Sequence, residues 1–142
     1  MFVDASHGEE LNALLKNWTD TEAKAKEAFV GFKDFLLSLE GVTLSFKSRP
    51  GVSYSIRAKH ENQVGREFFV VVDVVDDDPA DRWLSVCFYA EMINDTEELG
   101  DWVPKGLEEK YDACCFNIDE DDANLRAYVK DRIIEAYESA KK

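Results

Sequence analysis

The fold is decided by the stretch from Val42 to Tyr89, which reads VTLSFKSRPGVSYSIRAKHENQVGREFFVVVDVVDDDPADRWLSVCFY. Apolar and polar residues alternate in three parts of it, and a fourth part is an almost unbroken apolar run. Because successive side chains of a strand point to opposite faces, this period of two predicts neighbouring strands with one wet and one dry face. The four predicted strands are 42–47, 52–59, 68–75 and 83–89.

Turn sequences separate these strands and indicate how they connect. Arg49-Pro50-Gly51 and Asp76-Asp77-Asp78-Pro79 are typical of tight turns. Short turns between consecutive strands favour an antiparallel meander. The third strand is apolar on both faces, which predicts a central position.

Helical patterns lie on both sides of the predicted sheet. From Thr21 to Glu40 apolar residues recur at steps of three and four, and Gly41 follows as a stop. A second helix is predicted from about Asp121 to Ala140, after the acidic run 119–122 that would stabilise its N-terminus. Residues 1–20 add a short extra helix that begins with a capping box at Ser6.

The segment between Met92 and the last helix is harder to interpret. Tyr111–Ile118 predicts a fifth, shorter strand, and the long connection before it predicts only a helical turn near Thr96–Leu99. The expected fold is one α+β domain spanning residues 1–142. It has an antiparallel sheet of about five strands in a meander, with an N-terminal and a C-terminal helix packed on one face.

Composition narrows the classes of function. The chain has 17 basic and 30 acidic residues and a net charge of −13, a field that repels nucleic acid and anionic lipid. The longest apolar run is too short to span a membrane, and the first ten residues have no export signal. We therefore expect a soluble cytoplasmic protein that binds neither nucleic acid nor membranes.

The cysteines and histidines give no cofactor or metal signature. In a reducing compartment we expect Cys87, Cys114 and Cys115 to be free thiols. The adjacent pair 114–115 lacks the spacing of metal and redox motifs, so a zinc site that adds Cys87 and His60 is the less favoured alternative. We expect no metal, no cofactor and no catalytic histidine.

The most distinctive feature is a basic hairpin in an acidic chain. The alternation places Lys47, Arg57 and Lys59 on the outer face of the first hairpin, beside Ser45, Ser53 and Ser55. Such a face suits an anionic small molecule or an acidic protein partner. The alternative is that the protein's own acidic segments cover this face, or that it is simply a solvated sheet face. Trp102, in the long connection, is a further candidate contact.

These observations favour a non-catalytic binding or interaction module over an enzyme, and they leave the oligomeric state open. The competing function is a small enzyme in which a carboxylate, such as Asp73 or Glu91, acts as acid or base in a pocket. A carboxylate with a raised pKa in an ordered cavity would favour the enzyme. A flat basic patch would favour the binding module.

The order of elements also resembles a known group. The layout of helix, two hairpins, loop, short strand and helix, ending in Arg132-Ile133-Ile134-Glu135-Ala136-Tyr137, is similar to small bacterial α+β domains of the YdhG-like kind. The likeness covers about Thr21 to the end of the chain. It implies a fold and brings no site residue with it.

Overall fold

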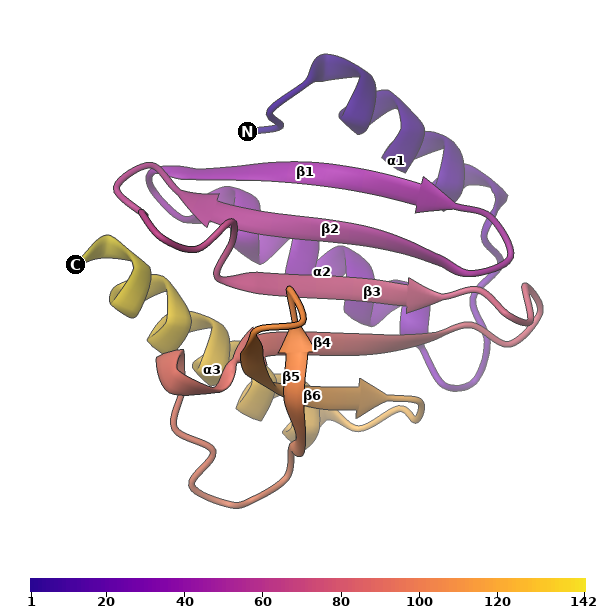
Figure 1. Ribbon diagram of the computed structural model, residues 1–142. Coiled ribbons are helices and arrows are strands. Elements are labelled where there is room, and N and C mark those ends of the chain that lie inside the picture. The colour runs from indigo at the N-terminus through magenta and orange to yellow at the C-terminus, as the bar shows by residue number, and fades with distance from the viewer.

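The computed structural model describes residues 1–142 and contains a six-stranded antiparallel sheet and three α-helices (Figure 1). The predicted α+β class is confirmed. The strands lie in the order β1-β2-β3-β4-β6-β5, so the first four form the predicted meander. Their bounds are Val42–Arg49 (β1), Ser53–His60 (β2), Val70–Val75 (β3), Trp83–Tyr89 (β4), Asp101–Leu107 (β5) and Tyr111–Ile118 (β6).

The sixth strand, β5, lies in the connection where only a helical turn near Thr96–Leu99 was expected. The connection does contain a turn at Thr96–Glu97, closed by the Glu98 N–H donating to the Asp95 carbonyl at 3.1 Å, and a 3-10 helix, η1, precedes it at Ala90–Met92. Pro104 and Gly106 obscured β5 in the sequence, because both are rare inside strands. They are tolerated here because β5 is an edge strand that pairs only with β6 and is irregular between Val103 and Leu107. The last strand, β6, therefore pairs with β4 rather than closing a simple meander.

Two helices cover one face of the sheet. The helix α2 (Ala25–Ser38) lies behind β1 to β4, and α3 (Ala123–Lys141) crosses behind the other part of the sheet (Figure 1). The arrangement of N- and C-terminal helices on one face was predicted. The helix α1 (Ala5–Asn17) is the predicted short extra helix, and it lies beside β1 (Figure 1).

The helix starts differ from the predicted positions because aspartates cap them. Asp4, rather than Ser6, caps α1 by accepting a hydrogen bond from the Ser6 backbone N–H at 2.9 Å. Asp20 accepts from the N–H groups of Lys26 and Glu27, both at 3.1 Å, so α2 begins four residues later than Thr21. Asp122 caps α3 as the acidic run suggested.

The edge of the sheet at β1 is not open. The N-terminal segment pairs with it through Val3 N–H to the Leu44 carbonyl at 2.8 Å and Leu44 N–H to the Met1 carbonyl at 2.7 Å. The Phe46 N–H donates to Nδ1 of His7 at 3.2 Å. These contacts satisfy backbone groups that an edge strand would otherwise leave unpaired.

The core lies between the sheet and the helices. Directly paired positions such as Ile56, Val72, Val86 and Phe116 are fully buried, and Phe46 is 5% exposed. The predicted inward side of the first hairpin is confirmed at these positions. Val52 is the exception at 58% exposed, because it belongs to the turn before β2.

The acidic turn after β3 was expected to be solvated, yet its first residue is buried. Asp76 is 2% exposed and accepts from the Gly51 N–H at 2.9 Å and from Nε of Arg82 at 2.7 Å. Burial would raise the pKa of Asp76, but the hydrogen bonds from Gly51 and Arg82 outweigh it and lower that pKa. Asp76 thus joins two turns at one end of the sheet.

The expectation of three free thiols is wrong. Cys87 of β4 and Cys115 of β6 lie directly opposite each other and form a disulfide, and only the buried Cys114 is free. The sequence pattern concealed this pair because the two residues are 28 positions apart and β5 intervenes in the chain.

No helix of the protein combines the length and apolarity that crossing a bilayer requires.

Candidate binding site on the open sheet face

The face of the sheet opposite the helices carries a polar row. The register places Lys47, Ser55, Asp73, Ser85 and Asn117 side by side across β1, β2, β3, β4 and β6. Side chains on one face of paired strands are neighbours, so this row brings a lysine, two serines and a carboxylate into one band.

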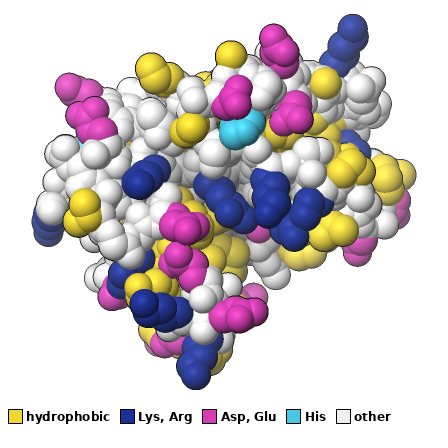
Figure 2. Space-filling model, turned by 45° about the horizontal axis from the view of Figure 1, so that its top comes forward, with side chains coloured by type: hydrophobic (Ala, Val, Ile, Leu, Met, Phe, Trp, Pro, Cys, Tyr) yellow, Lys and Arg dark blue, Asp and Glu magenta, His cyan; other side chains and the backbone are white.

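Four basic residues gather on the β1–β2 part of this face. Lys47, Arg49, Arg57 and Lys59 all occupy outward positions, and none of them forms a salt bridge. Figure 2 shows Lys and Arg side chains next to one another across the middle of the surface. Lys47 and Lys59 are exposed, whereas Arg57 is half-buried. A chain of net charge −13 therefore presents a local positive surface.

A hollow of about 360 Å³ lies next to these residues on the same face. Strands β2, β3 and β4 contribute Arg57, Asp73 and Cys87, and the tip of the β5–β6 hairpin contributes Leu107 and Glu108. Figure 1 shows β5 running in front of β4, which brings the hairpin over the outer face. The remaining lining residues are Glu67, Phe68, Val71 and Gly106.

A buried polar atom in the lining of this hollow, Nε of Arg57, has no hydrogen-bond partner. Ser55, which is not part of the lining, is paired with Asp73 of the neighbouring strand, and its hydroxyl acts on that carboxylate. Ser55 is 1% exposed, although the sequence predicted an outward and wet position. The guanidinium of Arg57 lies 5.7 Å from the centre of the Phe68 ring, which orients it toward the hollow. Unpartnered buried donors are costly, so they mark a place where a ligand would find hydrogen bonds.

Asp73 sits between these groups on the central strand β3. Burial raises the pKa of Asp73, and the Ser55 hydroxyl and the charges of Arg57 and Arg49 reverse only part of that effect. Asp73 has no salt bridge. The ionised form of Asp73 is therefore less stable in the folded protein than in water.

The other end of the hollow is apolar. Phe68 and Val71 form a second small cluster with Tyr89, separate from the main core, and Leu107 packs against it. The Phe68 and Tyr89 rings are 5.1 Å apart. The Tyr89 hydroxyl donates to the Glu108 carboxylate at 2.9 Å, and burial with this contact raises the pKa of Tyr89. This bond holds the hairpin tip over the sheet.

Trp102 does not lie with the basic residues. It is on β5, at the opposite edge of the sheet from β1, and 63% of it is exposed. It borders two further hollows, of about 290 and 360 Å³, the second of which contains Cys114. Lys47, Arg57 and Lys59 thus share one surface, and Trp102 belongs to another.

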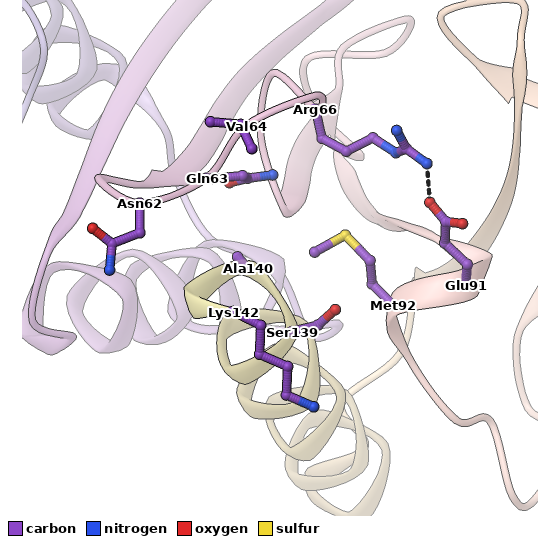
Figure 3. A pocket seen from close by; sticks show the side chains of 9 residues that line it. All are labelled: Asn62, Gln63, Val64, Arg66, Glu91, Met92, Ser139, Ala140 and Lys142. Carbon is purple, nitrogen blue, oxygen red and sulfur yellow. Dashed lines mark hydrogen bonds and ion pairs between the residues drawn. The ribbon is translucent and has the colours of Figure 1, made fainter.

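A hollow of about 370 Å³ also lies between the β2–β3 loop, η1 and the end of α3 (Figure 3). The side chains of Arg66, Glu91 and Gln63 in its lining already have partners within the protein. Arg66 pairs with Glu91 and stacks 3.7 Å from the centre of the Tyr111 ring, and the Gln63 side chain accepts from the His60 N–H and donates to the Phe68 carbonyl. Glu91, one of the two carboxylates considered for catalysis, is thereby engaged in an ion pair.

No cluster of three or more His, Cys, Asp or Glu side chains is arranged to hold a metal ion. The alternative zinc set does not assemble, because Cys87 and Cys115 are bonded to each other on the outer face and His60 packs against Tyr137 of α3 on the inner face. Burial and the nearby Asp95 raise the pKa of the third thiol, Cys114, to about 11.

Sequence reasoning missed the apolar and hairpin parts of the outer hollow. Phe68 was counted as a strand residue, and Leu107 and Glu108 belong to a strand and turn that the pattern did not reveal. Comparison of the chain with protein-family models, with curated proteins and with solved structures finds no match.

Proposed function

We propose that the protein is a non-catalytic binding module that takes an anionic group on the outer face of the β1–β2 hairpin, through Lys47, Arg57 and Lys59. One observation carries the proposal. Four basic side chains without salt bridges lie together on this face, and the buried Nε of one of them, Arg57, lacks a hydrogen-bond partner. An anion would supply both the charge and the hydrogen bonds that these groups lack.

The test compares two double variants of equal charge. Arg57→Gln with Lys59→Ser changes the proposed face, and Lys16→Gln with Lys142→Gln removes the same two charges from exposed positions elsewhere. Phosphate, citrate and poly-L-glutamate serve as probes in thermal-shift and titration experiments, since a ligand of the native state raises its stability. We expect the first variant alone to weaken binding at least tenfold, and added salt to weaken it in the wild type. Equal affinity in both variants, or no binding of any probe, would contradict the proposal.

A second candidate is a small enzyme that uses Asp73 as acid or base. The observation that favours it is the raised pKa of this carboxylate at the edge of a hollow. An Asp73→Asn variant separates the two functions. An enzyme loses turnover while it still binds substrate, and a binding module has no turnover to lose.

A cytoplasmic location, the absence of nucleic-acid partners and the YdhG-like resemblance stay predictions. The Cys87–Cys115 disulfide bears on the first of these, because thiol pairs in a reducing cytoplasm are usually kept reduced. Measuring the redox state of the pair in the native cell therefore tests the location.

A further inference from the structure

The hollow beside the basic hairpin contains charges of both signs. Arg57 is its only cation, and Asp73, Glu67 and Glu108 are its carboxylates. A ligand that carried only negative charge would meet Arg57 and three repelling groups. The lining is therefore better matched by a ligand that carries a cation as well.

The carboxylates are not equivalent. Glu67 and Glu108 are exposed, and Glu108 already accepts from the Tyr89 hydroxyl. Asp73 is largely removed from solvent and has no salt bridge. A cation that entered the hollow would be most strongly stabilised at Asp73, where its charge is least screened by water.

Arg57 and Asp73 are close enough to hold one small molecule. Arg57 pairs with Val71 across β2 and β3, and Asp73 is two residues along the same strand, so the two are diagonal neighbours. The Cα atoms of such neighbours are about 7–8 Å apart. A molecule with adjacent carboxylate and ammonium groups can therefore reach both side chains, each through a hydrogen bond of roughly 2.7–3.2 Å.

The apolar end of the hollow defines the rest of the ligand. Phe68, Val71 and Leu107 line it beyond the charged pair. The volume of about 360 Å³ is at the small end of the roughly 300–1,000 Å³ found for ligand pockets. The fitting molecule is small, with one apolar substituent.

We infer that this hollow binds a small zwitterion of the α-amino-acid class with an apolar side chain. Arg57 holds the carboxylate, Asp73 holds the ammonium group, and Phe68, Val71 and Leu107 contact the side chain. The inference rests on the proposed function, because it assigns the same Arg57 to an anionic group. It goes beyond that function in requiring a cationic group on the ligand.

The experiment uses three probes that differ by one charge. L-Phenylalanine carries both groups, 3-phenylpropanoate lacks the ammonium and 2-phenylethylamine lacks the carboxylate. Titrations of the whole chain, followed by backbone amide NMR shifts, should give L-phenylalanine an affinity at least tenfold above either analogue. The largest shifts should fall in β2, β3 and the β5–β6 turn.

Two variants separate the roles. Asp73→Asn should remove the preference for L-phenylalanine over 3-phenylpropanoate, and Arg57→Gln should remove its preference over 2-phenylethylamine. Glu120→Gln, an exposed change outside the hollow, should alter neither preference. Leu107→Ala tests the apolar end of the hollow without changing the charged pair. It should reduce the factor by which L-phenylalanine binds more tightly than glycine.

The outcomes distinguish this inference from the proposed function. Two results overturn the inference and leave the proposed function standing. In the first, 3-phenylpropanoate binds as well as L-phenylalanine. In the second, neither L-phenylalanine nor L-leucine binds, while phosphate, citrate or poly-L-glutamate still binds through Arg57 and Lys59. Binding of L-phenylalanine that both charge variants leave unchanged overturns the inference too. If no anionic probe binds at all, the proposed function fails.

Discussion

Reduction of the Cys87–Cys115 disulfide should destabilise the protein by an amount that the topology sets. The bond closes a loop of 28 residues that contains η1, β5 and the hairpin turn. The chain-entropy relation gives roughly 3.6 kcal/mol for a loop of this length, because the unfolded chain regains that conformational freedom. For a domain of this size the loss corresponds to a melting temperature lower by about 10 °C.

The assay is urea unfolding of the wild type with and without a reductant, beside two variants. Cys87→Ala with Cys115→Ala removes the bond, so its stability should not respond to the reductant. Cys114→Ala is the control, because that residue is buried at 4% exposure but is not cross-linked. Whatever it costs as a core substitution, Cys114→Ala should keep the wild-type response to the reductant.

Thiol titration of the unfolded chain gives an independent check. Without a reductant one thiol should react, that of Cys114. Three reactive thiols, or a wild-type free energy of unfolding that the reductant does not change, would refute the reasoning. The original expectation of three free cysteines would then be restored.

Three further predictions concern two charged groups, Asp76 and Asp95, and the exposed Trp102. Asp76→Asn should destabilise the protein by roughly 3–5 kcal/mol in urea unfolding, because it leaves the Arg82 guanidinium buried without its partner; a loss below about 1 kcal/mol would contradict this. The folded-state pKa values of Asp76 and Asp95 are lowered from 3.8. These two carboxylates therefore stabilise the fold fully above that pH, and their contribution is lost as the pH falls through the folded-state values. Unfolding midpoints measured from pH 5 to pH 2 should show the decline in stability, and Asp95→Asn should make it less steep. Trp102→Ala should change stability by no more than about 0.5 kcal/mol, since the side chain is 63% exposed, and a larger loss on thermal melting would mean that the ring packs.

Asp73 should behave in the opposite way. Its folded-state pKa is raised, so ionisation favours the unfolded chain as the pH rises above 3.8. Asp73→Asn should therefore stabilise the protein at pH 7 and bring little gain at pH 3, which paired urea unfolding curves would show. Lower stability of the variant at pH 7 would mean that the carboxylate is stabilised in the fold.

The elements that sequence reasoning located are those whose pattern is local. The alternation at Leu44, Phe46 and Ile56 marks the dry face because each strand has one buried side, and the steps of three and four in α2 mark its buried stripe. The basic face could be assigned for the same reason. These features depend on the neighbours of each residue in the chain.

The features that were missed depend on pairing between distant segments. Cys87 meets Cys115 only because β6 joins β4 rather than β5. The strand β5 lacks a repeating pattern because it is exposed along almost its whole length, so no buried face imposes alternation on it. The hollow beside Arg57 is lined by residues of β2, β3 and β4 and by the β5–β6 hairpin. Its apolar lining could therefore not be predicted without knowing that this hairpin lies over the sheet.

Most of the buried and half-buried polar groups have partners within the protein. Asp76 is tied to Arg82 and Gly51, Gln63 is tied to two backbone groups, and Asp95 accepts from Tyr128 and two loop N–H groups. Each of these residues joins two segments, which is sufficient reason for its burial.

Arg66 and Arg132 also carry buried nitrogens without a hydrogen bond, but each guanidinium forms an ion pair with a glutamate. Arg57 has no such partner, and Asp73 on the neighbouring strand has no salt bridge. Apolar or threonine side chains would suit these outward positions of a sheet at lower cost. The ligand that we propose would supply the partner that the Arg57 guanidinium lacks.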